Sequence, residues 1–432
     1  MISSRITQGL NGSPIIPGDK SISHRSVIIP SISNGICEIK NYLNSEDVLN
    51  TLNAFKSMGV NIKNEGKNLV IEGKGLNSLK KPSQNIYLGN SGTSARLLAG
   101  LLSSQNFETI LTGDKSLSSR PMGRIVNPLK KMNANILMDN NTMPLIIKGR
   151  KLLSGNININ LPSAQIKSGI ILAALNTAGK TIITENNVTR DHTEIMLKAF
   201  DANISIKKDG DKKIITIFGK KELKSNNIEV PCDLSSSAFF IVAALINNKS
   251  HIKLNNININ PTRNGILIAL KKMGAKISLH NERISNDEKV SDIEVHTSNL
   301  KGCELDADIA KLMIDEYPIL SIAASFASSP SVFRGLGELR VKESDRLKLI
   351  YLNLQKCGVK TEVINDDLYI YPSKNYIVKD KSIQTDFDHR IAMAFSVMGS
   401  KIGPLEISDP NSIKTSFPTF ITEFNRIGGL IS

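Results

Sequence analysis

A unit of one helix, a turn and two strands recurs along this chain about every 72 residues, and it constrains the fold more than any other feature of the sequence. In each copy an amphipathic helix ends at Gly, Asn or Asp, the residue types that tolerate the left-handed conformation closing a helix. An alternating strand, a polar turn and a second strand then follow, and the sixth copy is truncated. Successive closing residues are separated by 74, 68, 73, 84 and 70 positions. They are Gly59, Asn133, Asp201, Gly274, Gly358 and Gly428.

A second series of helices interleaves with the first at the same period. Each begins with a polar cluster and continues as a run of small and apolar residues, which predicts a helix buried on every face. The anchor residues are separated by 67, 73, 70, 81 and 74 positions. They are Arg25, Gly92, Gln165, Ser235, Glu316 and Arg390. Two series in phase indicate a true structural repeat.

Six units of this length account for the 432 residues. A long period with polar helix starts favours stacked α/β units over a thin solenoid. We therefore predict an α/β fold of two pseudo-symmetric domains, each built from three helix-strand repeats. The first domain would be discontinuous, comprising residues 1–18 plus 231–432, and the second would comprise residues 19–230.

Several of the polar helix starts carry cations. A positive charge opposes the positive end of the helix dipole, so it is disfavoured there unless an anion is bound nearby. Backbone amides, the dipole and cations together describe an anion site. The cations concerned are His24, Arg25, Lys167, His389 and Arg390. In contrast, Ser235–Ser237 read as ordinary N-cap residues.

Three loops are also rich in charge, at residues 119–124, 189–192 and 340–346. The last of these alternates carboxylates with cations, which also suits a solvated helix face. Asp315 and Glu316 interrupt an apolar run, a placement that suits a group that transfers protons. The formal net charge of +14 fits the capture of small polyanions and also fits nucleic-acid binding, so the charge alone does not decide between them.

Other classes of site find less support. The four cysteines lie far apart with no C-x-x-C pair, and the six histidines are scattered with no ligand spacing, so we predict no metal site. No apolar run approaches the roughly 18 residues of a membrane span, and no signal peptide is evident. We expect a cytoplasmic monomer that contacts neither a membrane nor nucleic acid.

Six motifs occur in order along the chain. They are PGDKSISHR at 17–25, GNSGT at 89–93, RPMGR at 120–124, SAQ at 163–165, the segment 340–346 and DHR at 388–390. In their content and their order, from residue 17 to about 418, the chain resembles the 5-enolpyruvylshikimate-3-phosphate synthase family. The variants GDKS, SAQIK, NVTR and RDHTE resemble the bacterial class II branch, which is often tolerant of glyphosate.

The resemblance implies two domains that close on the substrates, and transfer of the enolpyruvyl group of phosphoenolpyruvate to the 5-hydroxyl of shikimate-3-phosphate without a metal or organic cofactor. It assigns shikimate-3-phosphate binding to Lys20, Ser21, Arg25, Ser163, Ala164, Gln165, Arg190, Asp315 and Lys342. It assigns phosphoenolpyruvate binding to Lys20, Gly92, Arg120, Gln165, Arg346 and Arg390. It makes Asp315 the acceptor of the hydroxyl proton, and it gives Lys20 and Glu343 the proton transfer at the methylene carbon.

Two alternatives remain at this point. The sister enzymes that transfer enolpyruvyl to a UDP-amino sugar share the sixfold fold, but they usually present a reactive cysteine on a loop that here, at 111–120, contains none. A basic nucleic-acid-binding protein would account for the charge, although aromatic stacking platforms are lacking. The class II resemblance leads us to expect at least partial tolerance to glyphosate, although Gly92 stands where some glyphosate-tolerant relatives carry alanine.

Overall fold

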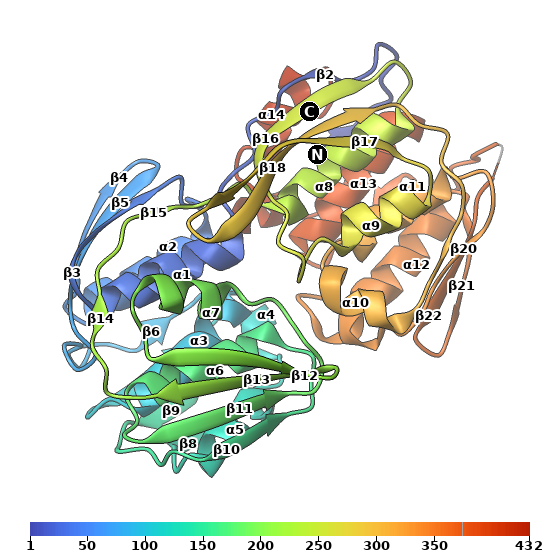
Figure 1. The fold of residues 1–432 in the computed structure, drawn as a ribbon. Helices are drawn as coiled ribbons and strands as arrows, with labels where there is room; N and C mark the ends of the chain where they lie inside the picture. Colours follow the sequence, from blue (N-terminus) through green and yellow to red (C-terminus); the bar gives the residue numbers. More distant parts are fainter. Residues whose placement is uncertain (374) are drawn as a thin grey trace. The chain divides into compact units, whose positions relative to one another are not determined.

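The computed structural model describes residues 1–373 and 375–432 (Figure 1). It divides into two compact units. Unit 1 comprises Met1–Pro17, Pro231–Ile284 and Lys289–Ser432, and unit 2 comprises Gly18–Val230 with Ser285–Glu288. Gly18 and the short segment Ser285–Glu288 therefore group with unit 2, whereas the sequence placed them in the first domain. A Cβ at Gly18 would lie 2.0 Å from the carbonyl oxygen of Asn41, so this glycine is tightly packed against unit 2.

The helices of unit 2 are α1 (Lys20–Ser31), α2 (Glu46–Ser57), α3 (Gly92–Ser103), α4 (Lys115–Ser118), α5 (Gly123–Lys131), α6 (Ala164–Leu175) and α7 (His192–Ala199). Those of unit 1 are α8 (Leu234–Ile246), α9 (Gly265–Lys272), α10 (Ala307–Met313), α11 (Tyr317–Ser325), α12 (Arg346–Lys356), α13 (His389–Ile402), α14 (Phe420–Arg426) and the 3₁₀ helices η1 (Gly337–Val341) and η2 (Pro410–Thr415).

Unit 2 contains three sheets. The first has the order β14 (Leu223–Lys224), β3 (Ser33–Lys40), β5 (Asn68–Lys74), β4 (Asn61–Glu65), and β15 (Ile228–Glu229) also pairs with β3. The second has the order β6 (Ile86–Tyr87), β7 (Glu108–Thr112), β9 (Leu145–Lys148), β8 (Asn135–Met138). The third has the order β10 (Asn156–Ile159), β11 (Lys180–Glu185), β13 (Lys212–Phe218), β12 (Ile204–Asp209).

The described residues of unit 1 also form three sheets. Their orders are β2 (Asn11–Gly12), β16 (His251–Asn258), β18 (Glu288–His296), β17 (Lys276–Ser285); then β19 (Glu304–Leu305), β20 (Ser331–Phe333), β22 (Asp367–Tyr371), β21 (Lys360–Ile364); and β23 (Ser382–Ile383), β24 (Leu405–Ile407), β1 (Ile2–Ser3). In all six sheets a parallel pair is followed by an antiparallel pair. The sixth sheet is completed by β1, from the opposite end of the chain.

The predicted repeat is confirmed in detail. All six residues that close the outer helices have positive φ, including the two that are not glycine, Asn133 at 68° and Asp201 at 61°. The six helices of the second series form at α1, α3, α6, α8, α11 and α13. All thirteen residues of α8 are buried, as its small and apolar composition predicts.

Each unit has its own hydrophobic core, built around the second-series helices. Close packing of α3 against α6 depends on glycine: a Cβ at Gly100 would lie 1.8 Å from the carbonyl oxygen of Gly169. No helix in residues 1–373 and 375–432 combines the length and the apolar character needed to cross a bilayer. The fold thus presents the amino-terminal ends of buried helices as fixed platforms for polar groups.

Candidate functional site

In unit 2 the first platform is the start of α1. Asp19 caps the helix, its carboxylate accepting a hydrogen bond from the amide of Ile22 at 2.9 Å. Lys20, at the first helical position, forms an ion pair with Asp47 in the first turn of α2. The Lys20 side chain is 16% exposed, so its charge is fixed in place while remaining accessible.

Arg25 lies one turn further along α1 and is buried among uncharged oxygens. Its guanidinium donates to Thr193 Oγ1 at 2.6 Å, to Ser168 Oγ at 2.6 Å and to the carbonyl of Ser21 at 2.8 Å. Burial lowers the pKa of Arg25 to about 10, so it still carries its charge near neutral pH. The nearby carboxylates of Glu194 and Asp19 oppose this shift, so they offset part of the cost of the buried charge.

The start of α3 supplies the second platform. A Cβ at Gly92 would lie 2.7 Å from Arg96 Nη1 and 3.1 Å from Arg120 Nη1, so two guanidinium groups approach this glycine closely. Arg96 donates to Gln165 Oε1 at 2.7 Å, and Gln165 in turn donates to Thr93 Oγ1 at 3.0 Å. Three of the four residues predicted to bind phosphoenolpyruvate in this unit, Gly92, Arg120 and Gln165, therefore lie around the start of α3.

The third platform is the start of α6. Ser163 caps the helix, its hydroxyl accepting from the amide of Ile166 at 3.4 Å, and Ala164 is the first helical residue. Arg190 follows β11 in the loop before α7 and is partly exposed. The Arg190 charge contributes to the lowered pKa of Arg25, which indicates that the two guanidinium groups lie near each other.

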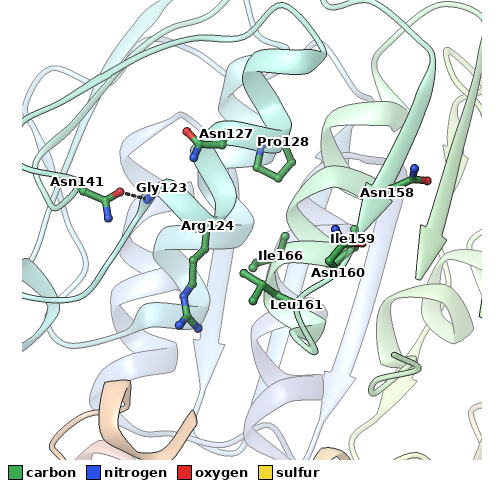
Figure 2. Close-up of a pocket in the computed structure, with 10 residues that line it drawn as sticks. All are labelled: Gly123, Arg124, Asn127, Pro128, Asn141, Asn158, Ile159, Asn160, Leu161 and Ile166. Carbon is green, nitrogen blue, oxygen red and sulfur yellow. Dashed lines mark hydrogen bonds between the residues drawn. The ribbon is translucent and has the colours of Figure 1, made fainter. Parts of the chain in front are cut away.

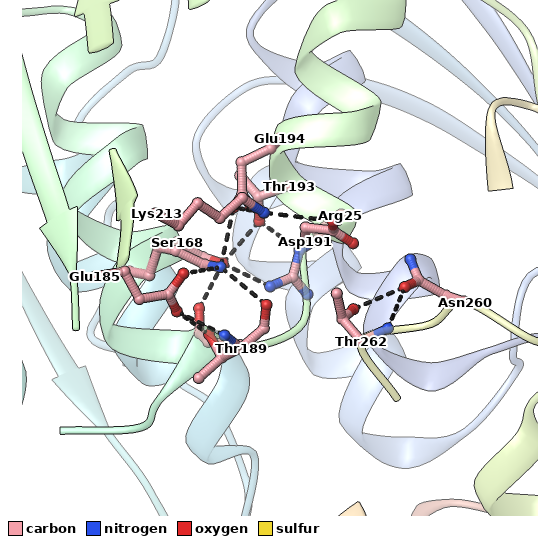
Figure 3. A network of polar contacts seen from close by, with 12 residues as sticks. Arg25, Ser168, Glu185, Thr189, Asp191, Thr193, Glu194, Lys213, Asn260 and Thr262 are labelled. Atoms are coloured by element: carbon pink, nitrogen blue, oxygen red, sulfur yellow. Dashed lines mark hydrogen bonds and ion pairs between the residues drawn. The ribbon is translucent and has the colours of Figure 1, made fainter. Parts of the chain in front are cut away.

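A buried ionic network supports the loop that carries Arg190 (Figure 3). Lys167 is fully buried and pairs with Glu185 at 3.0 Å and Glu194 at 2.9 Å. Its ammonium also donates to the carbonyl of Thr189 at 3.2 Å, while Glu185 accepts from the amide of Thr189 at 2.9 Å. Lys213 pairs with both Asp191 and Glu194 at 3.3 Å. Both neighbours of Arg190 are thereby fixed.

These contacts correct two sequence-based expectations. Lys167 is neutralised by two buried glutamates, so it stabilises the unit and does not serve as an anion-binding cation. His24 is also buried, with Nδ1 2.8 Å from Thr51 Oγ1, and burial together with the charges of Lys20 and Arg25 lowers its pKa well below the usual value. It is therefore neutral near pH 7, and the charge at this helix start comes from Lys20 and Arg25.

In unit 1 the predicted residues form a second cluster around Arg346. This guanidinium is fully buried and donates to Asp388 at 2.8 Å, Asp315 at 3.2 Å and Glu343 at 2.5 Å. Burial acts against the charge, but Asp388, Glu343 and Asp315 outweigh it and raise the pKa of Arg346. Asp315 and Glu343 remain 18% and 21% exposed, so one arginine fixes two accessible carboxylates.

Lys342 and Arg390 complete the unit 1 cluster. Arg390 lies in the first turn of α13, where its amide donates to Asp388 Oδ1 at 2.9 Å and its guanidinium donates to the carbonyl of Asp315 at 3.3 Å. Burial lowers the pKa of Lys342, although the Asp315 and Glu343 carboxylates oppose that shift. His389 is buried, with Nδ1 3.3 Å from Thr415 Oγ1.

Sequence reasoning missed two features of these clusters. Arg96 was not singled out, although an arginine four residues after Gly92 on an otherwise small and apolar helix is a usable signal. Asp388, the fully buried partner of Arg346, was quoted within a motif but given no role. Glu316 is not exposed with Asp315; it is buried and accepts a hydrogen bond from Ser235, which also accepts from Arg263 at 2.7 Å.

Figure 2 shows a separate cavity of about 390 Å³ in unit 2. Its lining includes Gly123 and Arg124, next to the Arg120 motif, and Ile166, next to Gln165. Asn141 closes one side, its Oδ1 accepting from the amide of Gly123 at 2.7 Å. None of the predicted substrate-binding residues is among its lining residues, so we assign it no part in the site.

Comparison with solved structures identifies the class of protein. The chain matches the enolpyruvyl transferase NikO from Streptomyces tendae with a TM-score of 0.77 over 100% of this chain and 97% of that one, at 14% identity, which shows the fold alone. It matches EPSP synthase from Acinetobacter baumannii with a TM-score of 0.86 at 41% identity, covering 99% and 98% of the two chains. The fold is that of the enolpyruvyl transferases.

Sequence comparison then gives the family. The model of EPSP synthase (3-phosphoshikimate 1-carboxyvinyltransferase) matches residues 4–424. The chain is 45% identical over 427 residues to the 3-phosphoshikimate 1-carboxyvinyltransferase of Ruthia magnifica subsp. Calyptogena magnifica, covering 98% of this chain and 96% of the relative. It is 44% identical to that of Coxiella burnetii (strain RSA 493 / Nine Mile phase I), with the same coverage. The chain belongs to the EPSP synthase family and is a transferase of the shikimate pathway, which confirms the resemblance drawn from the motifs.

Proposed function

We propose that the two clusters bind the two substrates and carry out enolpyruvyl transfer from phosphoenolpyruvate to the 5-hydroxyl of shikimate-3-phosphate. Both substrates are polyanions, and their mutual repulsion must be offset by fixed cations. The acceptor would contact Lys20, Ser21, Arg25, Ser163, Ala164, Gln165, Arg190, Asp315 and Lys342. Phosphoenolpyruvate would contact Lys20, Gly92, Arg120, Gln165, Arg346 and Arg390.

The observation that carries this proposal is the fixing of Asp315 and Glu343 by one buried guanidinium, that of Arg346. Addition requires two proton movements at once: the acceptor hydroxyl loses a proton as its oxygen attacks carbon 2 of phosphoenolpyruvate, and carbon 3 gains one. We assign the first to Asp315 and the second to Glu343 with Lys20. Collapse of the tetrahedral adduct returns a proton from carbon 3 and breaks the bond to phosphate.

Arg346 engages three carboxylates, which bears on its own assigned contact with phosphoenolpyruvate. A substrate carboxylate would replace the Glu343 or Asp315 oxygen on the guanidinium, whereas Asp388, which is fully buried, would keep its place. Binding of the substrate would then release one of the two proton-transferring carboxylates from its ion pair with Arg346. Electrostatic stabilisation by such positioned groups commonly contributes about 10²–10³ in rate per group.

The test is a phosphate-release assay with phosphoenolpyruvate, with and without shikimate-3-phosphate. Asp315→Asn and Glu343→Gln should each lower kcat by about 10²–10⁴, the range typical of lost acid–base catalysis. Asp308→Asn is the matched control, because Asp308 is an acid of the neighbouring helix α10 whose side chain is 91% exposed and pairs only with Lys311 among the ion pairs described. Equal losses in all three variants would contradict the proposed roles.

Substituting UDP-N-acetylglucosamine as the acceptor should release no phosphate above background. A monomeric state in the cytoplasm stays a prediction, which light scattering of the purified chain and fractionation of the source cells would check. Binding to duplex nucleic acid that weakens steeply between about 50 and 200 mM salt would contradict the assignment of the net charge to small substrates.

A further inference from the structure

Three of the six histidines of the chain gather on the solvent-facing side of one sheet in unit 1. They are His251 on β16, His280 on β17 and His296 on β18, and they surround Glu294. The Nε2 atoms lie 2.6, 3.2 and 3.7 Å, respectively, from a carboxylate oxygen of Glu294. The histidine side chains are 43–52% exposed, whereas the Glu294 side chain is 24% exposed. The group is thus accessible, and its carboxylate is at the centre.

The sheet register places these residues together. His251 pairs directly with His296 across the antiparallel β16–β18 pair, and their rings stack with centroids 4.2 Å apart at 9°. Glu294 is two residues before His296, so it points to the same side of the strand. The buried residues Ile293 and Val295 alternate with them and face the core. A one-residue slip would bury the histidines and expose these core side chains, so the arrangement is firmly specified.

The donor set is one that first-row transition metals prefer. Imidazole nitrogens with one carboxylate oxygen suit Zn²⁺, Cu²⁺ and Ni²⁺ better than Mg²⁺ or Ca²⁺. The ligand atoms of His251, Glu294 and His296 all lie within 4.8 Å of one another. Ligands held about 2.0–2.2 Å from zinc at a tetrahedral angle are about 3.4 Å apart, so the spacing of these atoms suits a metal. The parallel rings of His251 and His296 must turn out of their stack before both Nε2 atoms can point at one ion. His280 could supply the fourth ligand.

A surface ion-pair cluster would explain the same contacts more simply, but unlike a metal site it would not bind Zn²⁺ tightly. The Glu294 carboxylate lies within 3.7 Å of the Nε2 atoms of His251, His280 and His296, an arrangement that suits ion pairs with protonated imidazoles or a shared cation. Lys253 Nζ lies 3.9 Å from Glu294, and its charge opposes a bound cation. Ion pairs at such exposure contribute little to stability, whereas a chelated metal would be held by several ligands together.

We propose that His251, His280, Glu294 and His296 form a surface site for a first-row divalent transition metal of the Zn²⁺ type. None of the four belongs to the residues assigned to substrate binding or proton transfer. Our prediction of no metal site rested on spacing along the chain, and the fold brings together residues that are up to 45 positions apart. Stripping the metal is therefore expected to leave phosphate release unchanged.

The experiment is calorimetric titration of the full-length, untagged chain with ZnCl₂ after treatment with a chelator. We expect one equivalent to bind, and Co²⁺ to give the visible absorption of a tetrahedral site. His251→Ala and His296→Ala should each weaken binding by at least about 10-fold, a loss that even outer-shell changes can produce. Lys253→Ala is the matched control on the same face, and it should bind as tightly as the wild type or more tightly.

Each outcome decides the proposal. Absence of Zn²⁺ binding to the wild-type chain would overturn it, as would unchanged affinity in the His251→Ala/His296→Ala double variant. Phosphate-release activity and circular dichroism of every variant are measured in parallel, because normal values show that the chain is folded. A failure of the proposed catalytic roles would appear in those activities and not in the metal titration, so the two proposals are tested separately.

Discussion

Replacing Lys167 with methionine should destabilise unit 2 by about 3–5 kcal/mol, the usual cost of removing one partner from a buried ion pair. Lys167 is fully buried and lies 3.0 Å from Glu185 and 2.9 Å from Glu194, and both glutamates are buried as well. Methionine fills nearly the same volume, so the loss measures charge and hydrogen bonding and not a cavity. The carbonyl of Thr189 would also lose its donor at 3.2 Å.

The matched control is Lys221→Met, the same substitution in the same unit. Lys221 pairs with Asp201 at 2.7 Å, but both side chains are more than 40% exposed. An exposed pair is worth between about 0 and 1 kcal/mol, so this variant should unfold almost as the wild type does. Urea unfolding, monitored by hydrogen exchange of peptides from unit 2, measures the stability of the unit that contains both substitutions. Equal stability of the two variants would refute the reasoning.

The effect of Lys167→Met should also depend on pH. Burial raises the pKa of Glu185, and Lys167 opposes that shift, so the variant should raise it further. A carboxyl whose folded pKa is raised contributes stability below its unfolded pKa, and that stability is lost as pH rises through the folded value. The difference between variant and wild type should therefore be larger at pH 7 than at pH 5. A constant difference would contradict the assignment of the cost to buried carboxylates.

Three further predictions concern the site itself. Gly92→Ala would place a Cβ 2.7 Å from Arg96 Nη1 and 3.1 Å from Arg120 Nη1. Because these two atoms are the ends of flexible side chains, the fold should persist. The displaced guanidinium groups should lower kcat/KM for phosphoenolpyruvate by about 10- to 100-fold. Arg96→Met should lower kcat/KM by about 10-fold through loss of the 2.7 Å bond that orients Gln165, and Arg96→Lys should recover part of it; unchanged kinetics in Arg96→Met would exclude this positioning role. Because burial lowers the pKa of Lys342, the KM for shikimate-3-phosphate should rise at alkaline pH as that lysine loses its charge, and Lys342→Arg should move the rise to higher pH; an identical pH profile in both forms would argue against its contact with the acceptor.

The sequence predicted the repeat well because the repeat is encoded locally. Helix closure at Asn133 or Asp201 depends on the residue type at one position, and the alternation of each hairpin depends on residues next to one another. The same holds for the motifs at the helix starts, since cap residues act within three positions. Such features can be predicted from the sequence without knowledge of the tertiary contacts.

What the sequence did not predict depends on partners distant in the chain. Lys167 looks like a free cation at a helix start until Glu185 and Glu194 are placed against it. His24 likewise looks like a cation, but burial inside unit 2 lowers the pKa of its imidazole, and the charges of Lys20 and Arg25 act in the same direction. The histidines around Glu294 meet only because of strand register. The burial of a cation at a helix start and its carboxylate partners must therefore both be known before it is assigned to an anion site.

The pairing of β1 with β24 has a consequence for how the chain could be rewired. The amide of Ile2 donates to the carbonyl of Ser432 at 2.8 Å, and the amide of Ser432 donates to the carbonyl of Ile2 at 3.0 Å. A short peptide linker could therefore join residue 432 to residue 1 without stretching the backbone, giving a ring of six units with no natural starting point. Opening that ring at an exposed hairpin turn such as 210–211 would yield a permuted chain whose sixth sheet is no longer assembled from opposite ends.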